Sequence, residues 1–210
     1  MRKNTIIGYG GHSYMACDIM LRNGQEILGY FEQEEKKKNP FNLKYLGKES
    51  APEALPILIN NNWFVAFDNN HFRKFITEKL LQKNIGNPIS IIHNTSLIAS
   101  GVPIGFGSMI GPGAIINPLS TIGKSVICNT HATIGYECRI MDYAHIATGA
   151  VLAHNVQIGE RSFIGANAVI KEGVKIGDEV RIGAGSVVTK DVPPGTTLVG
   201  TNKQFTPKKR

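Results

Sequence analysis

The sequence predicts a chain in two parts: a small α/β domain of the Rossmann-like kind over residues 1–91 and a parallel β-helix over residues 92–210. The second part carries an apolar residue at every sixth position from Ile92 to Val188. Ser, Ala, Val or Cys follows each of these by four residues. A fixed six-residue period is typical of parallel β-helices. Before the repeat, segments with strand and helix patterns alternate, which favours a small parallel sheet.

The N-terminal elements can be placed from their periodicity. Residues 5–7 predict a strand that enters the glycine-rich turn Gly8-Tyr9-Gly10-Gly11-His12-Ser13, and apolar residues at helical spacing follow. The further expected elements are a strand at 27–31, a short helix at 52–59, a buried strand at 63–67, an amphipathic helix at 72–80 and a short strand at 89–92 that leads into the repeat.

A ligand crevice is expected where these strands end. A strand, a glycine-rich turn and a helix start present backbone N–H groups to an anion, and ligands bind at the carboxyl ends of parallel strands. Ser13 stands where a dinucleotide fingerprint has its third glycine, so a tight turn without a ligand remains the alternative. The residues expected to converge are Gly10, Gly11, His12, Glu32, Asp68 and Asn69.

The six-residue repeat predicts a coil with three flat faces, one hexapeptide per face. The aliphatic residue points inward, the small residue fills the corner, and the glycine that often follows the aliphatic residue relieves backbone crowding. Residues eighteen apart should then stack on neighbouring coils, about 4.8 Å apart. Tyr136 and His154 have this spacing and are expected to be vertical neighbours.

Composition excludes several classes of protein. The net charge of +7 is local, in Lys36 to Lys38 and in a basic tail from Lys203 to Arg210, and neither run contains the interleaved aromatics of a single-strand binding surface. We therefore expect no nucleic-acid partner.

Cys17, Cys128 and Cys138 form no C-x-x-C pair and are expected to be reduced packing residues. Without a signal peptide or a long apolar run, a cytoplasmic protein that does not insert into membranes is expected.

These motifs together resemble the PglD/NeuD-type sugar acetyltransferases. The resemblance rests on Gly8-Tyr9-Gly10-Gly11-His12, the stretch from Phe64 to Arg73, Asn129-Thr130, Glu137-Cys138, the segment around His145, and Val199-Gly200. It implies a left-handed β-helix and a homotrimer that binds acetyl-CoA in the groove between adjacent solenoids. It also implies transfer of the acetyl group to the amine of a nucleotide-linked amino-deoxy sugar, in surface polysaccharide or glycan biosynthesis.

The resemblance also implies roles for individual residues. Contacts to the substrate would come from Gly10, Gly11 and His12 at the diphosphate, from Glu32 and Gln33 at the base, and from Asp68 and Asn69 near the sugar. Asp68 occupies a position that is usually glycine. Contacts to acetyl-CoA would come from His145, Ala166 and Ala184.

One departure from the family concerns the catalytic base. After Asn129-Thr130 the family has a histidine followed by a carboxylate, and this chain has Tyr136-Glu137. An ordinary phenol, with a pKa of about 10, accepts a proton poorly at neutral pH. We expect His154 to act as the base beside Tyr136 and Glu137. His131 is a second candidate. In a third version no side chain acts as base, and the amine loses its proton to water or to the departing thiolate.

Other functions remain open on the sequence alone. A sugar O-acetyltransferase is a variant of the same chemistry, and a sugar-nucleotide binder without activity would be consistent with the missing histidine. A zinc hydratase would use His131, His145 and His154, but their spacing contains no close pair of ligands, and no metal is expected.

Overall fold

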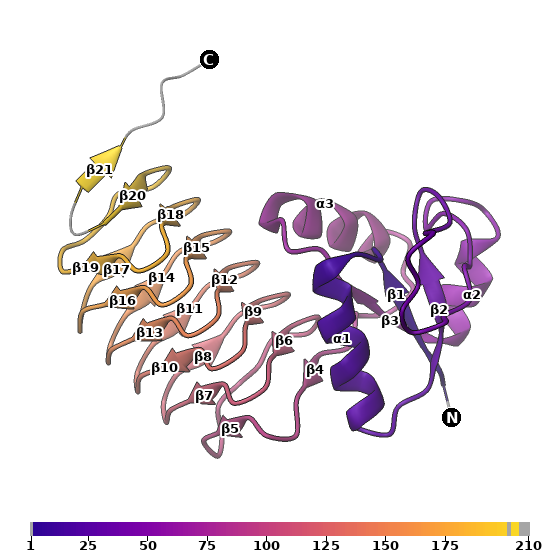
Figure 1. The fold of residues 1–210 in the computed structure, drawn as a ribbon, viewed down its shortest axis with the longest axis horizontal. Coiled ribbons are helices and arrows are strands. Elements are labelled where there is room, and N and C mark those ends of the chain that lie inside the picture. The colour runs from indigo at the N-terminus through magenta and orange to yellow at the C-terminus, as the bar shows by residue number, and fades with distance from the viewer. Residues whose placement is uncertain (1, 201–202, 206–210) are drawn as a thin grey trace.

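The computed structural model describes residues 2–200 and 203–205 of the 210-residue chain. The N-terminal part is a three-stranded parallel sheet in the order β2-β1-β3, with helices on both faces (Figure 1). Its elements are β1 (Asn4–Ile7), α1 (Gly11–Arg22), β2 (Ile27–Phe31), α2 (Ala54–Asn60), β3 (Asn62–Val65) and α3 (Asn70–Leu81). The predicted Rossmann-like α/β arrangement is confirmed.

Successive side chains of β1 and β3 point to opposite faces of the sheet, so the apolar core of the N-terminal domain has one part on each face. Ile6 and Phe64 pack with α1, whereas Ile7 and Val65 pack with α2 and α3. The third strand ends at Val65, before the predicted position 67, because the chain turns there toward α3.

The C-terminal part is a solenoid whose strands form three parallel sheets, and it matches the predicted left-handed β-helix. One sheet has eight strands and faces the N-terminal domain, and we call it the docked face: β4 (Ile91–Ile92), β6 (Met109–Ile110), β9 (Ile127–Cys128), β12 (His145–Ile146), β15 (Phe163–Ile164), β18 (Arg181–Ile182), β20 (Thr197–Val199) and the antiparallel β21 (Lys203–Phe205).

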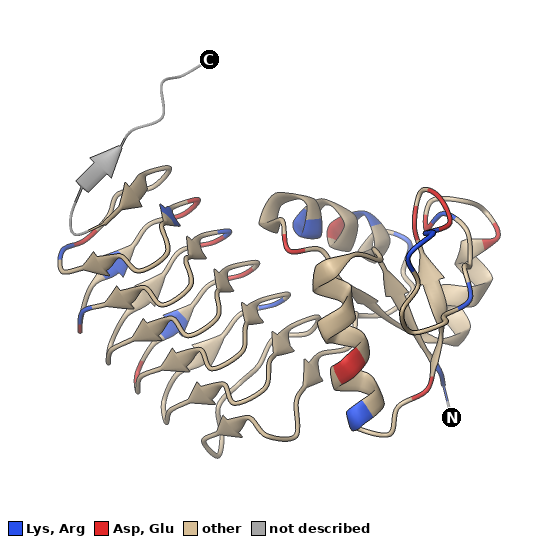
Figure 2. Cartoon of the chain, in the orientation of Figure 1, with Lys and Arg blue, Asp and Glu red and all other residues tan. Residues whose placement is uncertain are grey.

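The other two sheets carry different side chains. The open face is the six-stranded sheet of β5 (Leu97–Ile98), β7 (Ile115–Ile116), β10 (Thr133–Ile134), β13 (Val151–Leu152), β16 (Val169–Ile170) and β19 (Val187–Val188). The polar face is the four-stranded sheet of β8 (Thr121–Ile122), β11 (Arg139–Ile140), β14 (Gln157–Ile158) and β17 (Lys175–Ile176). Figure 2 shows the open-face strands free of charged residues.

The predicted register of eighteen residues holds through the coils. His145 pairs with Phe163, Thr133 with Val151 and Arg139 with Gln157. The aliphatic residues of the repeat fill the prism, from Ile110 to Val188. Ile92 is an exception, at 37% exposed, because it lies in the first coil and no further coil covers it.

Crowding at the corners explains the glycines that follow the aliphatic residues. A Cβ on Gly159 would lie 2.4 Å from the carbonyl carbon of Gly177 in the next coil. The left-handed backbone conformation occurs two residues later, for example at Arg161 and Asn167, which are not glycine. These glycines are therefore required for close approach between coils rather than for a positive φ.

The N-terminal domain packs on the solenoid through α1. Ile91, Met109 and Ile127 project from the docked face into the same apolar cluster as Ala16 and Met20 of α1. The cysteines predicted to be packing residues are reduced and buried. Among the described residues no helix is long and apolar enough to cross a bilayer. The basic tail lies mostly outside the described residues.

Candidate functional site

The glycine-rich turn forms an open start to α1. Ser13 Oγ accepts a hydrogen bond from the Gly10 amide at 2.8 Å and donates to the Gly10 carbonyl at 2.7 Å. Ser13 therefore closes the turn at the position of the missing third glycine. No atom would lie within 4 Å of a Cβ added to Gly10 or Gly11, so the space above this helix start is free. Such a turn can hold an anion on its backbone N–H groups.

Glu32 lies beside this turn, as predicted. Its Oε2 accepts a hydrogen bond from the Tyr9 amide at 3.1 Å, and Lys36 Nζ lies 3.4 Å from the same oxygen. A cavity of about 230 Å³ is lined here by Gly10, Gly11, His12, Glu32, Lys36 and Asp68, together with Tyr9, Ala66 and Phe67. Five of the six residues expected to converge therefore share one crevice at the carboxyl ends of the strands.

Two predicted substrate contacts lie elsewhere. Asn69 Oδ1 accepts a hydrogen bond from the Phe72 amide at 2.9 Å and caps α3. The Gln33 side chain donates to Glu49 Oε2 at 3.3 Å. Neither lines the crevice described above, although Asn69 lines a second cavity.

The second cavity, of about 520 Å³, lies between the start of α3 and the docked face. His145, Phe163 and Arg181, which follow one another on β12, β15 and β18, line it on the solenoid side. The N-terminal domain contributes Asp68, Asn69, Asn70 and His71. Asp68 lines both cavities, so the crevice and the second cavity meet at this residue.

Two histidines face each other where the domains meet. The ring centroids of His12 and His145 are 6.0 Å apart. Burial lowers the pKa of His12 to about 4, with a further contribution from the Arg73 guanidinium, while Asp68 opposes the shift. Burial lowers the pKa of His145 to about 3, and Arg73 and His12 act in the same direction. Both imidazoles are therefore neutral at pH 7.

These pKa shifts predict that acid destabilises the fold. Between pH 6.5 and 4 the unfolded chain binds more protons at these two positions than the folded chain, so the free energy of unfolding decreases as the pH decreases. The expected slope approaches about 1.4 kcal/mol per pH unit for each histidine. Urea unfolding at pH 7, 6 and 5 measures it. His145→Gln should have a shallower slope than the wild type, and equal slopes would contradict the prediction.

The remaining predicted residues lie on two edges of the open face. Ala166 and Ala184 occupy turns between the docked and open faces, which we call the docked–open edge. Tyr136, Glu137 and His154 occupy turns between the open and polar faces, the open–polar edge. The Tyr136 and His154 rings stack with centroids 4.8 Å apart and planes 5° apart, which confirms their predicted stacking.

His131 lies in the turn after β9, on the docked–open edge. As predicted, it is around a corner from Tyr136. Within the described part of the chain no three His, Cys, Asp or Glu side chains are grouped so that they could hold a metal ion.

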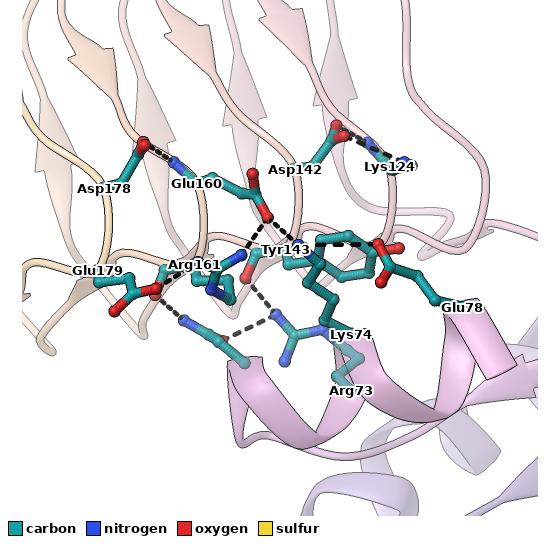
Figure 3. A network of polar contacts seen from close by, with 11 residues as sticks. Arg73, Lys74, Glu78, Lys124, Asp142, Tyr143, Glu160, Arg161, Asp178 and Glu179 are labelled. Atoms are coloured by element: carbon teal, nitrogen blue, oxygen red, sulfur yellow. Dashed lines mark hydrogen bonds and ion pairs between the residues drawn. The ribbon is translucent and has the colours of Figure 1, made fainter.

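Arg73 was not predicted as a site residue, although it ends the motif stretch that begins at Phe64. Only 1% of it is exposed, and its guanidinium donates to the Ser125 and Tyr143 carbonyls of the solenoid, at 2.9 and 2.8 Å, and to the Phe67 carbonyl at 2.9 Å. Figure 3 shows it beside Lys74, which forms an ion pair with Glu160 at 2.7 Å. This network fixes α3, and with it Asp68, against the solenoid.

Comparisons with known proteins agree with both halves of the architecture. Residues 3–80 match the family model described as PglD N-terminal domain, and residues 155–190 match the hexapeptide repeat of succinyl-transferase. A GDP-perosamine N-acetyltransferase of Escherichia coli O157:H7 is 36% identical over 86 residues, which span 41% of this chain and 38% of that protein. The match therefore covers well under half of that curated relative.

Solved structures match over nearly the whole length. A mutant of perosamine N-acetyltransferase from Caulobacter crescentus, in complex with CoA and GDP-perosamine, has a TM-score of 0.87 and 28% identity, covering 94% of this chain and 93% of that one. The acetyltransferase domain of PglB from Neisseria gonorrhoeae, in complex with acetyl coenzyme A, has a TM-score of 0.87 and 28% identity, covering 98% and 99%.

Proposed function

Because the chain belongs to the PglD/NeuD-type sugar acetyltransferases, we propose that it transfers the acetyl group of acetyl-CoA to the amine of a nucleotide-linked amino-deoxy sugar. The observation that carries this proposal is that two cavities share Asp68 as a lining residue. A crevice with an anion-binding turn meets, at Asp68, a second cavity that ends on the solenoid at His145. Related proteins have been solved with CoA and GDP-perosamine. We place the reaction in the cytoplasm, where acetyl-CoA is available, as a step in glycan assembly.

The proposed enzyme is a homotrimer, and the open face supports this. Its outward residues include Leu97, Val151, Val169 and Val187, which are 65%, 37%, 39% and 39% exposed. Thr133 interrupts this row between Ile115 and Val151, but an exposed apolar patch such as that of Val151, Val169 and Val187 marks an interaction surface. If three copies pack these faces around a common axis, the open–polar edge of one copy lies beside the docked–open edge of the next.

This packing also completes the site. In one chain the stacked Tyr136 and His154 are separated from Ala166 and Ala184 by the width of the open face. In the proposed trimer the two edges come from neighbouring copies and line one groove. Acetyl-CoA would lie in that groove, with its thioester between the His154 edge of one copy and the His145 cavity of the next.

His154 is the proposed general base in that groove. The acceptor nitrogen, as the free amine, attacks the thioester carbon, and a proton passes from nitrogen to His154 as the C–N bond forms. The tetrahedral intermediate collapses, the C–S bond breaks, and the thiolate takes the proton to leave as coenzyme A. Tyr136 holds the His154 ring by stacking on it, and backbone N–H groups stabilise the oxyanion. Glu137 lies next to this pair on the same edge.

His154→Asn is expected to lower kcat by a factor of about 10² to 10⁴, the usual contribution of a general base. The comparison variant is His131→Asn, the second candidate base on the other edge of the open face, where asparagine suits the left-handed backbone (φ 54°). A larger loss of kcat in His131→Asn than in His154→Asn would assign the base to His131. Full turnover by His154→Asn would favour the version of the mechanism without a side-chain base.

The function itself is tested by following thiol release from acetyl-CoA with UDP-, GDP- and dTDP-linked 4-amino-4,6-dideoxyhexoses. NMR of the product should show an N-acetyl group on at least one sugar. Matched sugars with a hydroxyl in place of the amine should give no thiol release. Acetylation of the hydroxyl sugars alone would indicate an O-acetyltransferase. Binding of amino sugars without thiol release would indicate a non-catalytic binder.

A further inference from the structure

Asp68 is the carboxylate at the junction of the two cavities. It follows β3 and directly precedes Asn69, the cap of α3, and it lines both the crevice and the second cavity. Its main-chain carbonyl accepts a hydrogen bond from Arg73 Nη1 at 3.2 Å, which fixes the backbone. Its carboxylate forms no hydrogen bond or ion pair with another side chain of the described residues. A carboxylate on a fixed backbone therefore lines both cavities with no cation of the described residues in direct contact with it.

Other charged residues line the two cavities near Asp68, and they are paired elsewhere: in the crevice, Lys36 lies 3.4 Å from Glu32. His12 and His145 are neutral, and the Arg73 guanidinium donates only to carbonyl and amide oxygens. In the second cavity, Arg161 is already paired with Glu160 and Glu179. Arg181 lies two strands beyond His145 and stacks over the Phe163 ring at 5.6 Å. None of these cations neutralises the Asp68 carboxylate by direct contact.

The position of Asp68 matches the place of the acceptor sugar. With a diphosphate at the open start of α1, where Ser13 already accepts the Gly10 amide, a sugar directed toward His145 lies beside Asp68, which lines both cavities. An amino sugar in water near neutral pH is largely an ammonium ion, and a charge-assisted hydrogen bond to a carboxylate is stronger than a neutral one.

We propose that Asp68 binds the ammonium group of the acceptor sugar and so selects amino sugars over their hydroxyl counterparts. This inference rests on the proposed function and names its specificity-determining residue. Before attack, the ammonium group loses one proton to solvent, so that His154 of the neighbouring copy stays neutral and can accept the second proton as the C–N bond forms. The amine keeps a hydrogen bond from a remaining N–H to Asp68, which holds the nitrogen on the side of His145. A hydroxyl sugar offers no positive charge and gains less from the same carboxylate.

The test compares wild type, Asp68→Asn and Asp68→Gly, with Glu53→Gln as the control. Glu53 is an exposed carboxylate at the start of α2 that lines neither cavity. Steady-state kinetics use the amino sugar of the panel that wild type acetylates best, and calorimetry measures binding of that sugar, of its hydroxyl counterpart and of the nucleoside diphosphate alone. Melting temperatures show whether each variant is folded.

Both Asp68 variants are expected to raise KM and Kd for the amino sugar at least about tenfold, because they lose a hydrogen bond between two charged groups. Binding of the nucleoside diphosphate alone and of the hydroxyl sugar should change less than twofold, as should every value for Glu53→Gln. An unchanged preference for the amino sugar in Asp68→Asn and Asp68→Gly overturns the Asp68 proposal while the proposed function stands. If wild type acetylates no amino sugar in the panel, the proposed function fails, and the Asp68 proposal fails with it.

Discussion

Lysine at both Val151 and Val169 is expected to prevent assembly of the proposed trimer and to abolish turnover. The two valines are neighbours in register on β13 and β16, and each is more than a third exposed in the single chain. Burying a valine side chain in the interface contributes about 1.5 kcal/mol or more. Three copies would instead bring six ammonium groups together around the axis. Because both side chains point outward, the fold of the single chain should remain intact.

Light scattering during size-exclusion chromatography measures this change. Gln157→Lys, on the adjacent polar face, is the matched control and should remain trimeric. A second measurement tests whether the site is shared between copies. His154→Asn and Ala184→Trp change opposite edges of the open face, so each alone should be inactive, and mixed trimers should regain part of the activity. A trimeric, active double-lysine variant would contradict the proposed interface.

Arg73→Leu is expected to lower the free energy of unfolding by about 3 kcal/mol or more, because each buried acceptor left without a donor costs about 1–3 kcal/mol. Leucine would leave the carbonyls of Ser125 and Tyr143 and the Asn70 side chain without their buried donor. Burial already lowers the pKa of Arg73 to about 9, which still leaves it protonated at neutral pH. Removing the guanidinium therefore removes both a cation and the hydrogen bonds that join α3 to the solenoid.

Urea unfolding followed by circular dichroism measures the loss. Arg139→Leu, on the polar face and exposed, is the control and should change the free energy of unfolding by less than about 0.5 kcal/mol. Arg73→Lys should recover only part of the stability, because a single ammonium group cannot reach the oxygens on both sides of the planar guanidinium. If Arg73→Leu unfolds at the wild-type urea concentration, Arg73 does not hold the domains together.

The repeat made the solenoid and its register predictable, including the stacking of Tyr136 on His154. The choice of docked face was not predictable in the same way. Met109 and Ile127, which pack under α1, occupy the same kind of outward strand position as Val151 and Val169, which are exposed. A six-residue pattern cannot distinguish a position covered by another domain from an uncovered one.

The role of Arg73 could not be predicted from the sequence for a related reason. Its partners in the solenoid are main-chain carbonyls more than fifty residues away, such as Ser125 and Tyr143. Any residue type provides a carbonyl, so these positions carry no sequence signal. The crevice residues were easier to predict, because strand ends of a parallel sheet meet at one edge and glycines mark the turn.

The eighteen-residue register has a consequence for how proteins of this shape can change in length. Insertion or removal of one complete winding lengthens or shortens the prism and leaves every face and edge in line, whereas a single-residue deletion rotates all later side chains out of line. Windings added after the last described coil would therefore leave the residues that line the second cavity in place. Evolution can lengthen the solenoid in whole steps of this kind, independently of the pocket that selects the sugar.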